Sequence, residues 1–415
     1  MKSMKCLDRS YLEFLVYLNG MEMNGFKIYD LFKALYSGDI EIDECYRSLS
    51  RIYMVLEHLL GDPQLSLYKL SEITRGTRAS DFFREYGNII LTSGDTSTYV
   101  HNVLKSEFNV LKAKISELLR IIEVIYEAVL VAVLGLSTLS LMPIWPFPPL
   151  IGILVLEFTG LTGYFTSLMV MKKLYYHIIP PVIIVDTVLL LSSVSLLFVN
   201  YIGAIIYSMV IITMHFLTRR FTNPILNMEK ESLRLLNDTY SRTIQGETVD
   251  VALVDSLSKS KLKEYRLLWY GILSGSGSKE ILEKINLPVL AGKVLSLLTG
   301  LLQYSDLGSL YVISISHFVD EVNGLRKFVE ERSKYYLLYS TILALLMATS
   351  YYMFTQFSTI IGDLRILGIY GYLGVLSTSV PACVLRSTGF TSSKASILVV
   401  IFALIVYLVI THGVI

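Results

Sequence analysis

Residues 93–134 read SGDTSTYVHNVLKSEFNVLKAKISELLRIIEVIYEAVLVAVL and lead from a polar helix pattern directly into an apolar one. An amphipathic run extends from Thr96 to Ile122, and the sequence is apolar from Val124 onward. No proline or glycine interrupts residues 96–134, so we expect one continuous helical rod. Asp95 or Thr96 is well placed as its N-cap, because a short side-chain oxygen accepts from free first-turn N–H groups.

The same plan occurs a second time. Tyr304-Ser305-Asp306 precedes a run from Leu307 to Arg332, and the sequence becomes apolar from Tyr335. Both runs carry an apolar stripe at helical spacing. We interpret the pair as an internal duplication, in which Gly94 and Asp95 of the first copy correspond to Ser305 and Asp306 of the second.

The composition excludes an ordinary soluble protein. Hydrophobic residues make up 53% of the 415 residues and charged residues only 17%, against about 25% in soluble domains. The charges concentrate in residues 1–120 and 219–334. The sequence therefore predicts an all-α polytopic membrane protein with about seven transmembrane helices and two small cytosolic helical-bundle modules.

Seven apolar windows are long enough for a bilayer, which takes about 20 residues. They fall at 124–144, 149–171, 178–199, 201–217, 336–357, 366–385 and 395–412. The predicted domains are a first module at 1–122, four spans at 123–218, a second module at 219–335 and three spans at 336–415.

The basic residues set the predicted orientation, because cytoplasmic loops carry an excess of lysine and arginine. One side of the spans holds Lys172, Lys173, Arg219, Arg220, Arg332, Lys334, Arg386 and Lys394. This arrangement predicts a multi-pass protein of the cell membrane, with the N-terminus and both modules cytoplasmic and the C-terminus extracellular. We interpret Lys172-Lys173 and Arg219-Arg220 as topology anchors, with docking of an acidic protein surface as a second role.

Residue patterns for catalysis or cofactor binding are absent from the sequence. The Gly-rich stretch 271–280 lacks the spacing of a phosphate-binding loop, and the six histidines do not pair at metal-ligand spacing. A net charge of +1 argues against direct binding of nucleic acid. Cys6, Cys45 and Cys383 are expected to be reduced thiols. We expect no enzymatic activity, no cofactor and no metal.

Three stretches of the first module, 25–35, 79–86 and 93–100, resemble the type II secretion system protein F domain. They read GFKIYDLFKAL, ASDFFREY and SGDTSTYV. The second copy, 268–335, is similar but more degenerate, with Ser305-Asp306-Leu307 at the position of the family's Gly-Asp/Glu-Leu element. The resemblance covers the soluble blocks and the start of the apolar segment after each.

This resemblance implies a non-enzymatic platform protein for a type IV pilus, an archaellum or a type II secretion machine. Such a platform contacts a cytosolic hexameric secretion ATPase and helps pilin-like single-span subunits leave the lipid bilayer. Bacterial pilus platforms usually have three spans, so about seven is similar to the archaeal branch. We expect a homodimer or higher homo-oligomer, because symmetric assemblies commonly begin as dimers.

Two acids fall inside predicted spans, Glu157 in the second and Asp186 in the third. An ionisable group there costs at least about 2.5 kcal/mol on insertion scales, so it faces protein or water. Each acid is either protonated or hydrogen-bonded inside the bundle, or it lines a groove for a pilin helix. An alternative function, a secondary transporter, would use both as an ion site, and a membrane-anchored signalling scaffold also stays open.

Overall fold

The computed structural model describes residues 5–40, 42–141, 149–177, 201–274, 282, 285, 287–300, 309–356 and 364–386. Every regular element in these ranges is an α-helix, which confirms the predicted all-α class. The chain forms two compact units. Unit 1 comprises Met1–Leu111 and Asn227–Val322, and unit 2 comprises Lys112–Leu226 and Asn323–Ile415.

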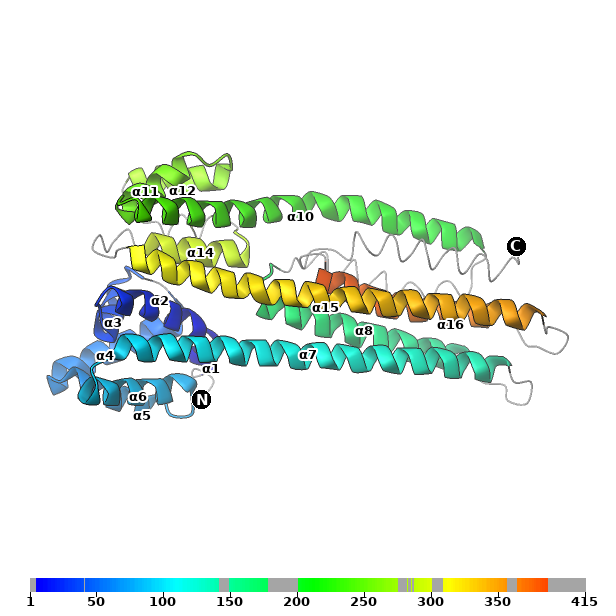
Figure 1. The fold of residues 1–415 in the computed structure, drawn as a ribbon, viewed down its shortest axis with the longest axis horizontal. Coiled ribbons are helices and arrows are strands. Elements are labelled where there is room, and N and C mark those ends of the chain that lie inside the picture. The colour runs from blue at the N-terminus through cyan, green and yellow to red at the C-terminus, as the bar shows by residue number, and fades with distance from the viewer. Residues whose placement is uncertain are drawn as a thin grey trace. The chain divides into compact units, whose positions relative to one another are not determined.

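Three long helices contribute residues to both units: α7 (Thr96–Leu141), α10 (Tyr201–Ile244) and α15 (Ser309–Gln356). Figure 1 draws α7 and α15 as single unbroken helices. At 1.5 Å per residue, the 46 residues of α7 extend about 69 Å. The predicted continuous helix over 96–134 is therefore confirmed.

The first part of unit 1 is a bundle of short helices with an aromatic core. Its helices are α1 (Lys5–Arg9), α2 (Tyr11–Met23), α3 (Ile28–Ser37), α4 (Glu44–Leu60), α5 (Pro63–Ile73) and α6 (Arg78–Thr92). Gly61 ends α4 in the left-handed conformation at φ +64°, and Asp62 then accepts from the Gln64 N–H to cap α5. In the core, Phe14 stacks on Tyr46 and Phe32 on Tyr53, with ring centroids 4.8 and 4.6 Å apart.

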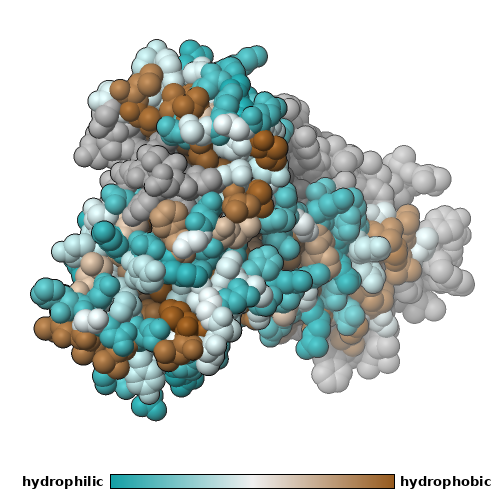
Figure 2. All heavy atoms as spheres, turned by 60° about the vertical axis from the view of Figure 1, so that its left-hand side comes forward, coloured by the Kyte–Doolittle hydropathy of each residue, from teal (hydrophilic) through white to brown (hydrophobic). Residues whose placement is uncertain are grey.

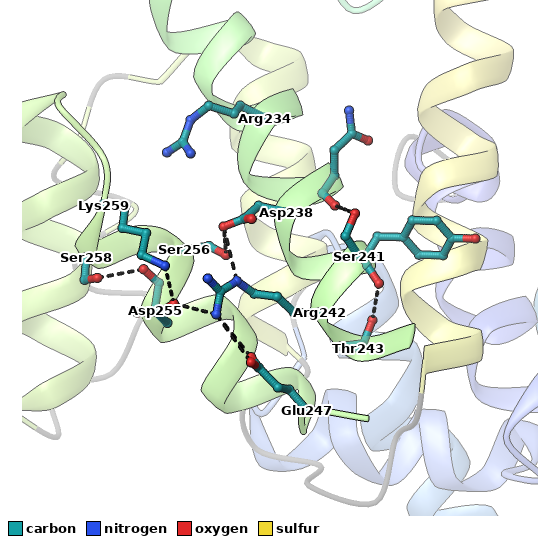
Figure 3. Close-up of polar contacts among 12 residues, drawn as sticks. Arg234, Asp238, Ser241, Arg242, Thr243, Glu247, Asp255, Ser256, Ser258 and Lys259 are labelled. Atoms are coloured by element: carbon teal, nitrogen blue, oxygen red, sulfur yellow. Dashed lines mark hydrogen bonds and ion pairs between the residues drawn. The ribbon is translucent and has the colours of Figure 1, made fainter. Parts of the chain in front are cut away.

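The second part of unit 1 contains the end of α10, α11 (Val249–Ser258), α12 (Lys263–Leu273), α14 (Val289–Gly300) and the start of α15. A charged cluster holds α11 against α10 (Figure 3). In it, Arg242 lies 3.5 Å from Asp238 and 3.3 Å from Glu247, and it also pairs with Asp255. Lys259 adds a pair to Asp255 at 2.7 Å, and the hydrogen bond and charge of Lys259 help to lower the pKa of that carboxyl.

Residues of both predicted modules meet inside unit 1, where α2 packs against α14 and α15. A Cβ atom added at Gly20 would lie 2.5 Å from Cδ2 of Tyr311, so the α2 backbone lies directly on that buried ring. The Asn19 Nδ2 donates to Ser314 Oγ at 2.8 Å, and Lys293 pairs with Glu13. The two parts of unit 1 therefore share one core.

The core of unit 2 is α16 (Leu364–Arg386), which packs along α8 (Pro149–Lys173). Glycines allow this close approach, because a Cβ at Gly160 would come within 2.8 Å of the Ser377 hydroxyl. Segment Gly368–Leu385 of α16 is entirely buried, whereas α8 exposes a row of large apolar side chains. The exposed ones are Leu150, Ile151, Leu154, Val155, Phe158, Phe165 and Met169.

Within the described residues, two helices are long and apolar enough to cross a membrane, Leu150–Lys173 and Gly368–Leu385. The predicted spans at 178–199 and 395–412 lie outside those residues. Those at 124–144, 201–217 and 336–357 fall on α7, α10 and α15 as far as these helices are described. The count of seven spans stays a prediction.

The expectation of three reduced thiols is wrong. Cys6 of α1 and Cys45 of α4 form a disulfide with a Cα–Cα distance of 6.2 Å, and Cys383 is a buried free cysteine. The two partners are 39 residues apart, and they meet only because α1 packs against α4. No local spacing in the sequence indicates that contact.

Candidate functional site

A groove of about 1060 Å³ lies in unit 2. Helices α7 and α15 form its walls, and Thr378 of α16 contributes to its lining. The lining side chains are Glu123, Tyr126, Glu127, Leu130 and Val131 of α7, and Phe328, Glu331, Arg332, Lys334, Tyr335, Tyr336, Tyr339 and Leu343 of α15. Most of these positions recur three or four residues apart, so each wall is one helix face.

Two stacked tyrosines lie between the walls. The rings of Tyr126 and Tyr336 are 5.0 Å apart at an interplanar angle of 14°. The Tyr126 hydroxyl donates to the Thr378 carbonyl oxygen, and the Tyr336 hydroxyl lies 3.2 Å from the carboxylate of Glu123. Both rings are buried, so they fix the spacing of α7 and α15 beside the groove.

Several of the side chains that line the groove are charged. Arg332 Nη1 lies 3.6 Å from Glu123 Oε1 and forms the ion pair found there. Glu127, Glu331 and Lys334 are exposed, and none of them has an ion pair within the described part of the chain. Two carboxylates and one ammonium group are therefore open to a ligand.

The groove draws one wall from each half of the predicted duplication. Tyr126 and Tyr336 follow Asp95 and Asp306 at almost the same distance. The last charged residue of each wall is Glu127 in α7 and Lys334 in α15, and only uncharged residues follow it in the helix. The sequence alone did not single out these residues as a site. The available signal was the change from charged to apolar positions on one face of each helix.

The predicted intramembrane acids are not among the groove residues. Glu157 is buried within α8, and Asp186 lies outside the described residues. The neighbouring Leu156 carbonyl oxygen accepts from Ser377 Oγ of α16 at 2.9 Å. Glu157 thus belongs to the packed core of unit 2.

The predicted motif positions Gly94 and Asp95 terminate one helix and begin the next. Gly94 adopts φ +70° after α6, a conformation that favours glycine. Asp95 Oδ1 accepts from the Thr98 N–H at 3.1 Å and caps α7, and hydrogen bonding by Thr98 lowers the pKa of Asp95. Ser305 and Asp306 lie outside the described residues.

Thr96, next to this cap, ties α7 to a buried carboxylate. Its hydroxyl donates to Glu22 Oε2 at 2.7 Å, and Lys27 pairs with the same oxygen at 3.0 Å. Tyr86 donates to the other oxygen of Glu22. The motif therefore anchors the start of the long helix to the bundle of unit 1.

The predicted basic positions lie on α8 and α10. Lys172 and Lys173 are exposed in the last turn of α8. Arg219 and Arg220 lie on α10, and their side chains are outside the described residues. Arg326, which the sequence did not single out, donates to the carbonyl oxygens of Leu174 and Tyr175 just beyond α8.

A second exposed surface lies on α12 in unit 1. Apolar patches appear among polar side chains on the face drawn in Figure 2. The exposed apolar side chains on α12 are Leu267, Tyr270 and Leu273. The exposed Lys263 and Arg266 lie on the same helix face. Lys261, Lys263, Arg266, Leu267 and Tyr270 line a hollow of about 330 Å³.

The described residues contain no group of three or more His, Cys, Asp or Glu able to hold a metal ion. In comparisons with known proteins, no family model matches the chain, and no curated protein or solved structure is significantly similar to it.

Proposed function

We propose that the chain is a non-enzymatic platform protein of the cell membrane for a type IV filament assembly machine. In this proposal it couples a cytosolic hexameric secretion ATPase to the movement of pilin-like single-span subunits from the lipid bilayer. The filament would be a pilus, an archaellum or a type II secretion pseudopilus. About seven spans, cytoplasmic modules, an extracellular C-terminus and a homodimer or higher oligomer belong to the same proposal.

The observation that carries the proposal is the pair of long helices α7 and α15. Each starts in the helical bundle of unit 1, and each continues without a break into an apolar segment of unit 2. Exposed apolar side chains on α7, α8 and α15 support membrane placement of unit 2, since soluble monomers rarely expose large contiguous apolar patches. The module motifs quoted above point to the filament machine.

The outer face of α12 is the surface we assign to the motor. Lys261 and Lys263 are exposed cations, and Leu267, Tyr270 and Leu273 add exposed apolar area beside them. An acidic protein surface with an apolar centre complements this face. The basic pairs Lys172-Lys173 and Arg219-Arg220 suit anionic lipid at the inner leaflet instead.

Affinity purification of the tagged protein from its native membrane, after mild cross-linking, tests the proposal. We expect mass spectrometry to identify a secretion ATPase and small single-span pilin-like proteins. A K261E/K263E variant should lose the ATPase and keep the pilin-like proteins. Recovery of neither partner with an intact, complementing protein contradicts the platform function and favours the transporter, which solute-flux assays on Glu157 and Asp186 variants then test.

A further inference from the structure

We propose that the groove between α7 and α15 binds a phospholipid whose headgroup carries a primary amine. The inference rests on the proposed membrane placement of unit 2, but not on the filament role. It assigns a ligand to a hollow that neither the duplication nor the module motifs explain.

The groove is lined by both charged and apolar side chains. Along α15 the charged Glu331 and Lys334 precede the apolar Leu343, and along α7 the charged Glu127 precedes the apolar Val131. Along α15, the distance from Glu331 to Leu343 is about 18 Å at 1.5 Å per residue. A ligand that contacts both kinds of side chain is an amphiphile with a charged head and an apolar tail.

Both helices that form the walls of the groove carry exposed apolar side chains. Val131 is 67% exposed on α7, and Leu338 and Ile342 are 56% and 41% exposed on α15. A hollow between two exposed apolar helix faces opens toward lipid once these faces are in a bilayer. Lipid molecules are then the ligands present at the highest concentration.

The free charges of the groove select the headgroup. After Arg332 pairs with Glu123, two carboxylates and one ammonium group remain, Glu127, Glu331 and Lys334. A phosphoethanolamine headgroup presents an ammonium group with three N–H donors to the carboxylates and a phosphate to Lys334. A phosphocholine headgroup carries no N–H donor, and a phosphoglycerol headgroup carries no cation.

The tyrosines fit the same ligand. Tyr335 and Tyr339 are exposed on the groove wall, and tyrosine is enriched where a protein meets the headgroup level of a bilayer. The volume of about 1060 Å³ is at the upper end of small-molecule sites. It accommodates a headgroup together with adjoining chain segments.

Lipid retention tests the proposal on the full chain. The protein is reconstituted into bilayers of equal parts phosphatidylethanolamine, phosphatidylcholine and phosphatidylglycerol, and then transferred to detergent. Mass spectrometry of the intact protein counts the lipids that stay bound. We expect phosphatidylethanolamine to exceed phosphatidylglycerol about tenfold, which corresponds to one charge-assisted hydrogen bond of about 1.4 kcal/mol.

Two double variants separate the groove from general surface charge. The E127Q/E331Q variant should bring the two lipids to equal retention, because it removes both free carboxylates. The E117Q/E330Q variant removes two exposed carboxylates from the same helices outside the groove, and it should retain the tenfold preference. Equal retention by the unmodified protein, or a preference that survives E127Q/E331Q, overturns the proposal.

The same preparation distinguishes this inference from the proposed function. A chain that alkaline carbonate extracts from native membranes is not inserted, and that result overturns both membrane placement and the lipid site. A chain that stays inserted and prefers phosphatidylethanolamine, but brings down neither ATPase nor pilin-like protein, contradicts only the platform role.

Discussion

Arg326 of α15 donates from Nε to the Leu174 carbonyl oxygen at 3.1 Å, immediately after the last turn of α8. The same guanidinium donates to the Tyr175 carbonyl oxygen and lies 3.9 Å from the centre of the Tyr176 ring. The carbonyl oxygens at a helix C-terminus lack intrahelical partners, and a cation there also interacts favourably with the helix dipole. The Arg326 side chain of α15 thus caps the C-terminal end of α8.

We predict that R326Q lowers the stability of unit 2 by about 2 kcal/mol, because charge-assisted hydrogen bonds and a cation–π contact are lost. R326K should recover less than half of this, since an ammonium group cannot match the planar guanidinium fork. Thermal unfolding in detergent measures both. The control is K327Q at the exposed neighbour Lys327, and it should leave the midpoint of thermal unfolding unchanged. Equal midpoints for R326Q and K327Q would show that the contact contributes nothing.

Gly20 lies against Tyr311 in unit 1, so we predict that G20A destabilises this unit by about 1–3 kcal/mol through overpacking. Tyr311 is fully buried and has little room to move. The matched variant is G87A in α6, where an added Cβ meets nothing within 4 Å. It should be stabilising by about 0.5–1 kcal/mol, since alanine favours the helix. Chemical denaturation should give opposite signs for the two variants, and the same sign for both contradicts the close packing.

The Cys6–Cys45 disulfide closes a loop with a sequence separation of 39 residues. We predict that breaking it costs about 4 kcal/mol, on the chain-entropy scale for a loop of that length. C6S, C45S and the double variant should all lose nearly the same stability, because either single change removes the bond. A reducing agent should destabilise only the unmodified protein. Additive losses in the double variant would contradict the disulfide.

This disulfide also bears on the predicted cytoplasmic location of the first module. Disulfides are rare in reducing cytosol, but intracellular proteins of hyperthermophilic archaea and bacteria are rich in them. A cytoplasmic module with a structural disulfide therefore fits an organism of that kind. In such an organism, the predicted cytoplasmic orientation of the first module is compatible with its disulfide.

Burial raises the pKa of Glu13 above its usual value, although Lys293 beside it acts in the opposite direction. An acid whose pKa is higher in the folded state stabilises the fold at low pH and loses this contribution as pH rises through the folded-state pKa. We predict that the contribution of Glu13 to the free energy of unfolding of unit 1 decreases as pH rises above the usual glutamate range. E13Q should remove that part of the pH dependence. Parallel stability curves for E13Q and the unmodified protein between pH 4 and pH 7 would show that Glu13 does not titrate in this way.

Helix periodicity predicted the regular elements well and the tertiary contacts poorly. The stripe from Val100 to Ile122 indicated α7, since 3.6-residue spacing is a local property of the chain. The groove depends on Tyr126 stacking on Tyr336 across 210 positions of sequence, and no local pattern specifies that pairing. Gly94 and Asp95 were predicted as motif positions, and the structure gives them roles in a helix terminus and a cap.

The continuity of α7 leads to a prediction about function. Residues 96–141 form one helix, so a movement at its start in unit 1 turns or shifts the apolar end without a hinge. Inserting Gly-Gly after Ile121 adds two flexible residues and rotates the following helix by about 200° at 3.6 residues per turn. On the proposed platform function, we predict that filament assembly is lost while the protein level in the membrane is retained.

The control for this insertion is Gly-Gly after Gly246, in the exposed turn between α10 and α11. That turn already contains a left-handed glycine at φ +98°, and lengthening a surface turn costs little. Filament assembly, scored by electron microscopy of cells carrying each variant, should survive the control and fail for the α7 insertion. Full assembly with Gly-Gly after Ile121 would mean that α7 does not act as a rigid lever.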